Sequence, residues 1–169
     1  MAPKPIQIVD ENDRPLKSGT MEDAQRDGLW HRIARVVIED ENGRFLLQKR
    51  SAAMSTFPGC WDTSAAGHVD FGETYSVAAR REALEETGLA DLSLKEIESY
   101  RSESVQGEKI LNRFNKTYQS RIGSKRQFTP DPEEVEELRW FSKQEVADLI
   151  NDHPDEVTDG LKHAFPHLA

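Results

Sequence analysis

Apolar and polar positions alternate along much of the chain in short runs that predict β-strands. The clearest pair of runs lies at 35–40 and 44–50, separated by Glu41, Asn42 and Gly43. Because an Asn-Gly step favours a tight reversal of the backbone, we expect these two runs to form a hairpin. Further strands are expected at 6–9, around 92–100, at 110–120 and at 138–141.

A helix is predicted in the middle of the chain, where the alternation stops. Thr74 can cap its first turn, and the helix should run to about Thr87 because Gly88 offers the left-handed stop. Val77 and Leu84 are seven residues apart and are expected to form an apolar stripe on this helix.

Two further helices are expected near the ends of the chain. Ser142 and Glu145 have the spacing of a capping box, which predicts a helix from 143 to about 151. A shorter helical segment is expected at 21–27, before Gly28. Strands flanked by helices on both sides in the sequence favour a layered α/β/α sandwich.

Composition limits the classes of protein that remain. The chain has 169 residues, 36% of them hydrophobic, and no linker-like tract, so we expect one domain over 1–169 with an N-terminal extension at about 1–30. A net charge of −9 disfavours long nucleic acid as a partner. The single Cys60 excludes an internal disulfide, and no apolar leader or membrane span is seen, so a cytoplasmic location is expected.

The predicted central helix carries the candidate chemistry. Residues three and four apart share a helix face, so Glu82, Glu85 and Glu86 should gather three carboxylates in one small volume. Such a set of hard oxygen ligands suits Mg²⁺, with Mn²⁺ as an alternative. Arg81 is offset by one position and can orient a carboxylate, either Glu85 or the preceding Glu73.

These residues resemble the Nudix box, which here spans 67–89 and predicts a member of the Nudix hydrolase superfamily. The matching positions are Gly67, Glu73, Arg81, Glu82, Glu85, Glu86, Gly88 and Leu89. The resemblance implies an α/β/α sandwich with a mixed central sheet, and it implies that the main-chain carbonyl of Gly67 joins Glu82, Glu85 and Glu86 as a metal ligand.

Segments outside the box resemble the branch that contains isopentenyl-diphosphate isomerase, which raises a rival function. These segments are residues 28–32, 46–51 and 57–62. In that isomerase a catalytic cysteine immediately precedes the positions of Gly67 and His68, and here Ala66 takes its place. Cys60 is six residues away and is better explained as a small buried side chain. The isomerase activity is therefore disfavoured.

Further candidate site residues come from the acidic run after the box and from two histidines and an arginine. The resemblance implies that a carboxylate from the acidic run 131–137 reaches the site, and we expect Glu134, with Glu137 as second choice. His31 and His68 match metal ligands of the isomerase, and with Arg50 they are candidate contacts for the substrate.

Together these observations predict a Mg²⁺-dependent hydrolase of a diphosphate linkage in a nucleoside diphosphate derivative or a nucleoside di- or triphosphate. Glu85, Glu86 and Glu134 are the candidate catalytic residues. A non-catalytic nucleotide sensor ranks last, because such a protein would be expected to lose its metal carboxylates. The expected partner is a small-molecule diphosphate, a nucleotide by preference, and no long nucleic acid or membrane is expected. The protein is expected to be a monomer or homodimer.

Overall fold

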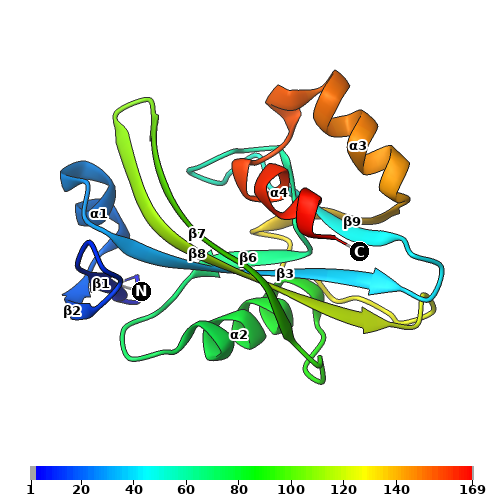
Figure 1. Ribbon diagram of the computed structural model, residues 1–169, viewed down its shortest axis with the longest axis horizontal. Coiled ribbons are helices and arrows are strands. Elements are labelled where there is room, and N and C mark those ends of the chain that lie inside the picture. Colours follow the sequence, from blue (N-terminus) through cyan, green and yellow to red (C-terminus); the bar gives the residue numbers. More distant parts are fainter. Residues whose placement is uncertain (1–2, 169) are drawn as a thin grey trace.

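The computed structural model describes residues 3–168 and contains one mixed sheet with helices on both faces (Figure 1). The strands are β1 (Ile6–Val9), β2 (Pro15–Gly19), β3 (His31–Asp40), β4 (Phe45–Arg50), β5 (Trp61–Asp62), β6 (Ala65–His68), β7 (Lys95–Gln106), β8 (Lys109–Ile122) and β9 (Val135–Phe141). The helices are α1 (Met21–Asp27), α2 (Tyr75–Thr87), α3 (Lys143–Asp152) and α4 (Asp159–Ala164), with short 3₁₀ turns at Pro154–Glu156 and Phe165–His167. The predicted α/β/α sandwich with a mixed central sheet is confirmed.

Strand β3 organises the sheet because four strands pair with it. β8 runs parallel to β3 over its whole length, while β1, β4 and β6 pair with it in antiparallel fashion. The β6 pairing involves Ile33 to Val36, and the β4 pairing involves only Ile38 and Glu39. The edge of β3 opposite β8 is therefore shared by β1, β6 and β4, and the sheet forks between β4 and β6.

Hydrophobic side chains fill both faces of this sheet. One cluster lies between the sheet and α2 and includes Val36, Leu46 and Ala79, and the other lies under α3 and α4 and includes Val37 and Leu161. Figure 1 shows α2 on one side of the sheet and α3 with α4 on the other. No helix in residues 3–168 is long and apolar enough to cross a membrane.

Most elements predicted from the sequence are present, with caps at the expected residues. Thr74 accepts a hydrogen bond from the Val77 amide, Gly88 ends α2 with a φ of 82°, and Ser142 and Glu145 form the capping box of α3. The short strands β2, β5 and β6 were not predicted. β6 consists of Ala-Ala-Gly-His, a sequence with little intrinsic preference for a strand.

The predicted apolar stripe on α2 is wrong. Val77 and Leu84 are 51% and 50% exposed, whereas Ala78, Ala79 and Ala83 are buried against the sheet. Small side chains on the inner face let the helix axis approach the sheet closely, because no large side chain separates the two. This close approach matters for the site, since the glutamates on the same helix must reach β6.

We expect Ala79→Leu to destabilise the protein by about 1 to 3 kcal/mol, because added methylenes overfill the contact between α2 and the sheet. Leu84→Ala, on the exposed face, should change stability by no more than about 0.5 kcal/mol. Urea unfolding of both variants and the wild type measures this difference, and a larger loss in Leu84→Ala than in Ala79→Leu would contradict the packing described.

Candidate functional site

The site is built where α2 crosses β6, at the fork of the sheet. Gly67 lies in β6 directly opposite Glu82, and a Cβ added to Gly67 would overlap the Glu82 carboxylate. Only glycine therefore allows the carboxylate to lie against the strand. The Gly67 backbone lines the same cavity as Glu82, close enough for its carbonyl to be a candidate ligand.

Glu86 extends from α2 into the fork between β4 and β6. The Ala66 amide donates to one of its oxygens at 2.8 Å, and the Gln48 side-chain amide donates to the other at 3.2 Å. The carboxyl is only 1% exposed. Burial, together with the nearby Glu82, raises its pKa well above the ordinary value.

Glu82 and Glu134 complete a compact carboxylate cluster with Glu86. One oxygen from each of the three groups lies within 4.8 Å of the others. Burial raises the pKa of Glu82 to about 7 despite the neighbouring Arg81, and burial followed by Asp131 and Glu85 raises the pKa of Glu134. Buried carboxylates so close together are destabilised by desolvation and repulsion, and a divalent cation relieves both. The donor set therefore fits a hard metal ion.

Glu134 reaches the cluster because its loop is tied to two elements of the site. The Asp131 amide donates to the Glu85 carbonyl at the end of α2, and the Ser51 amide donates to the Glu134 carbonyl just after β4. Glu137, the second choice, pairs with Arg139 and does not line the cavity among the described residues. Glu134 is thus the member of the acidic run that lies at the box.

Glu85 lies at the rim rather than in the compact cluster. Its side chain is 41% exposed, and one oxygen is 3.5 Å from Arg81. It lines the same cavity as Glu82 and Glu134.

Arg81 connects the carboxylates to the loop before α2. Its Nε and one Nη contact the two oxygens of Glu73 at 2.8 and 3.0 Å, and its other Nη is 2.6 Å from Glu82. The guanidinium also donates to the His68 carbonyl at 2.9 Å, and Asp70 lies 3.5 Å away. These contacts tie Arg81 to Glu73, to Glu82 and to β6, and the orienting role of Arg81 and Glu73 stays a prediction. Asp70 was not identified from the sequence.

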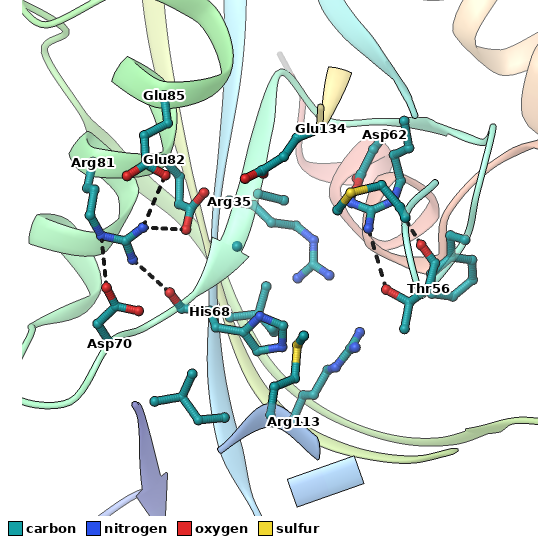
Figure 2. Close-up of a pocket in the computed structure, with 18 of the residues that line it drawn as sticks. Arg35, Thr56, Asp62, His68, Asp70, Arg81, Glu82, Glu85, Arg113 and Glu134 are labelled. Carbon is teal, nitrogen blue, oxygen red and sulfur yellow. Dashed lines mark hydrogen bonds and ion pairs between the residues drawn. The ribbon is translucent and has the colours of Figure 1, made fainter. Parts of the chain in front are cut away.

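A cavity of about 410 Å³ opens in front of the carboxylates, and its walls differ in charge. Glu82, Glu85 and Glu134 line it together with Arg81, Asp62 and Asp70. Three further arginines line the cavity: Arg35, Arg50 and Arg113. Figure 2 shows Glu82 and Glu134 above Arg35, with His68 and Arg113 below.

Two of the three candidate substrate contacts line the cavity, and the third does not. Arg50 lines the cavity, where its guanidinium donates to Thr56 and lies 3.5 Å from Asp62. His68 lines it as well, and the ring of His31 stacks on His68 at 5.4 Å without lining the cavity. His31 could therefore act on a substrate only through His68. Burial lowers the pKa of both imidazoles, that of His31 to about 4, so both rings are neutral at pH 7.

Arg35 and Arg113 were missed by the sequence analysis. Each occupies a strand position whose side chain is buried, being 6% and 8% exposed. An arginine inside a strand otherwise rich in isoleucine and valine, as in Ile33 to Ile38, is the signal that could have identified Arg35.

The single thiol takes no part in this arrangement. Cys60 donates to the Asp155 carbonyl at 3.6 Å, and burial raises the pKa of the thiol. Ala66, not Cys60, lines the cavity beside Gly67. No cysteine faces the carboxylates in the part of the chain that the structure describes.

Known proteins resemble this chain over most of its length. The model of the NUDIX domain family matches residues 29–161. The isopentenyl-diphosphate Delta-isomerase 2 of Photorhabdus laumondii is 30% identical over 163 residues, covering 96% of this chain and 90% of that protein. An uncharacterized Nudix hydrolase of Yersinia pestis is 30% identical over 142 residues, covering 84% and 75%.

A solved structure from Deinococcus radiodurans shares the whole fold. It matches with a TM-score of 0.80 at 24% identity, covering 98% of this chain and 99% of that one. The domain match and the Nudix hydrolase relatives support a hydrolase of pyrophosphate linkages, of a family that typically uses a divalent metal. The chain belongs to the Nudix hydrolase superfamily.

Proposed function

We propose that this protein is a Mg²⁺-dependent hydrolase that cleaves the diphosphate linkage of a nucleoside diphosphate derivative or a nucleoside di- or triphosphate. The observation that carries the proposal is the cluster of the buried Glu82 and Glu86 with the half-buried Glu134, at a cavity of about 410 Å³. The cavity is large enough for a nucleotide-sized ligand. We take residues 1–169 as a single domain of this kind, because β1 pairs with β3 and α4 packs in the second core cluster.

Each group of the site has a proposed role. Glu82, Glu86 and the Gly67 carbonyl hold the ion, with Glu85 completing the ligand set from the rim. When bound, the ion would neutralise charge on the diphosphate oxygens and lower the pKa of a bound water. Arg81 fixes the Glu82 carboxylate and holds Glu73 at the loop.

Glu134 accepts the proton of the attacking water. Its raised pKa suits a general base, and its loop position, separate from α2, places it across the cluster from Glu85. Attack at phosphorus breaks the bridging P–O bond, releasing a monophosphate and the remaining phosphorylated fragment.

Double-bond isomerisation is the alternative, because a relative named as an isopentenyl-diphosphate isomerase is 30% identical. It is disfavoured here by the absence of a thiol at Ala66 and by the placement of Cys60 away from the cavity. A panel of nucleoside di- and triphosphates, nucleotide sugars, dinucleotides and isopentenyl diphosphate separates the two activities. Hydrolysis yields phosphomonoesters, pyrophosphate or phosphate, which a coupled phosphatase or pyrophosphatase converts to phosphate, whereas isomerisation yields none of these products.

Glu86→Gln should lower kcat by at least about 10²-fold with saturating Mg²⁺, because the variant loses an ionic ligand at the centre of the cluster. Glu137→Gln removes the same charge three residues after Glu134 and should keep near wild-type turnover. Steady-state phosphate release by both variants measures the contrast. Equal turnover in Glu86→Gln and wild type would exclude this role for Glu86.

The metal-free protein should lose stability as pH rises from about 4.5 through about 7. The pKa values of Glu82 and Glu86 are raised in the folded state, so folding binds protons that the unfolded chain has released, and this contribution is lost when the folded groups ionise. Saturating Mg²⁺ should restore stability at pH 7 and above.

Thermal unfolding in EDTA and in Mg²⁺ across this pH range measures both effects. Glu86→Gln should flatten the pH dependence in EDTA, because it removes one of the carboxyl groups whose pKa is raised. The assignment of the cluster as a metal site would be contradicted if the stability of the wild type in EDTA did not depend on pH. It would also be contradicted if Mg²⁺ did not change the melting temperature.

A further inference from the structure

Three buried guanidinium groups, those of Arg35, Arg50 and Arg113, line a wall of the cavity. Arg35, Arg50 and Arg113 are between 6% and 8% exposed. A guanidinium stays charged even when buried, so burial is costly unless an anion or good hydrogen bonds compensate. The three arginines differ sharply in the compensation they receive.

Arg50 has protein partners, and the other two are poorly compensated. Arg50 donates to Thr56 and lies 3.5 Å from Asp62. Arg35 donates to the side-chain oxygen of Asn115, and its Nε has no partner within residues 3–168. Among those same residues Arg113 makes neither a side-chain hydrogen bond nor an ion pair, and its Nε is buried without a partner.

The fold itself brings Arg35 and Arg113 together. β3 and β8 run parallel, with His31 opposite Arg113 and Arg35 opposite Thr117, so alternation along both strands places Arg35 and Arg113 on the same face of the sheet. α4 packs over that face at Gly160, where an added Cβ would overlap the Arg35 guanidinium. Both arginines line the main cavity and a smaller adjoining one of about 110 Å³.

The protein's counter-charge on this wall lies beside Arg50, where Asp62 is 3.5 Å away, while Glu103 and Asp159 line the smaller adjoining cavity. Burial, followed by repulsion from Arg35 and Arg50, lowers the pKa of Arg113 to about 10. No carboxylate of residues 3–168 lies within 4 Å of the Arg35 or Arg113 guanidinium. His68 lies on the same cavity and is neutral at pH 7, so it contributes no negative charge.

We propose that Arg35 and Arg113 form an oxyanion subsite that binds a terminal phosphate of the substrate, on the far side of the cavity from the metal-binding carboxylates. Two adjacent guanidinium groups suit a terminal phosphate, which carries nearly two negative charges at pH 7, better than a diesterified phosphate with one. The subsite therefore selects nucleoside di- and triphosphates, which have a free phosphate end, over nucleotide sugars and dinucleotides, whose phosphates are esterified at both ends. This inference rests on the proposed function for the identity of the reaction.

Arg113→Gln is the most informative variant, because the wild-type side chain has no partner within residues 3–168 that the substitution would leave unsatisfied. Arg126→Gln is the matched control, since it removes the same charge from an exposed ion pair with Asp91. Arg113→Lys keeps the charge and loses the planar fork, so it should recover part of the wild-type behaviour.

Binding is measured first, by titrating inorganic pyrophosphate into the protein in EDTA, where the metal site cannot contribute. Wild type and Arg126→Gln should bind pyrophosphate, and Arg113→Gln should bind it about ten- to a hundred-fold more weakly. Without the anion, Arg113→Gln should melt at the same temperature as wild type or higher, because it relieves repulsion with Arg35. No binding by wild type, equal binding by Arg113→Gln, or a lower melting temperature for Arg113→Gln would overturn the proposal.

Substrate preference is measured next, as the ratio of kcat/KM for a nucleoside triphosphate to kcat/KM for a nucleotide sugar in Mg²⁺. Arg113→Gln should lower this ratio about tenfold or more, with Arg126→Gln unchanged, and an unchanged ratio in Arg113→Gln would overturn the selection. The two proposals fail separately. Arginine-dependent pyrophosphate binding without hydrolysis of any substrate would reject the proposed function alone, and hydrolysis with no effect of Arg113→Gln would reject the subsite alone.

Discussion

The repulsion among the buried carboxylates at the fork of the sheet is the constraint on which the rest of the site depends. Glu82, Glu86 and Glu134 are brought within 4.8 Å of one another, and Glu82 and Glu86 are buried there while Glu134 is half-buried at the cavity. The fold compensates part of this repulsion, through the Ala66 amide and the Gln48 side chain at Glu86 and through Arg81, which lies 2.6 Å from Glu82. The remaining negative charge lowers the free energy of unfolding of the metal-free protein, and it favours the binding of a divalent cation.

Close packing makes that arrangement possible. The alanines on the inner face of α2 bring the helix near the sheet, and Gly67 leaves room for the Glu82 carboxylate against β6. Larger side chains at either place would move the helix outward and separate the three carboxylates. Arg81 then holds the helix face and the preceding loop in register through Glu73 and the His68 carbonyl.

The cavity is polarised because the two faces of the sheet contribute opposite charges to it. α2 and the loop before β9 supply carboxylates, while the interior positions of β3 and β8 supply Arg35 and Arg113. A diphosphate with a bound divalent cation presents both signs of charge, so it complements such a cavity better than either an anion or a cation alone. The same polarisation gives this acidic chain, with a net charge of −9, a local arginine-lined wall for the proposed anionic substrate.

The sequence alone determined the local structure and the identity of the box. The helix caps at Thr74, Gly88 and Ser142 depend only on residues a few positions apart. The same is true of the helical spacing of Glu82, Glu85 and Glu86. These features could therefore be predicted without knowledge of the fold. Two other features could not be predicted in this way: the outward direction of Val77 and Leu84, and the formation of a strand by β6. Both depend on the residues that pack against them. Glu134 rather than Glu137 lies at the site because its loop forms hydrogen bonds to α2 and to the end of β4. Arg35 and Arg113 lie close together because β3 and β8, 78 positions apart in the chain, pair in the sheet. Only the tertiary structure decides such contacts, because the free energy that forms them comes from burial and pairing across the whole sheet rather than from neighbouring residues.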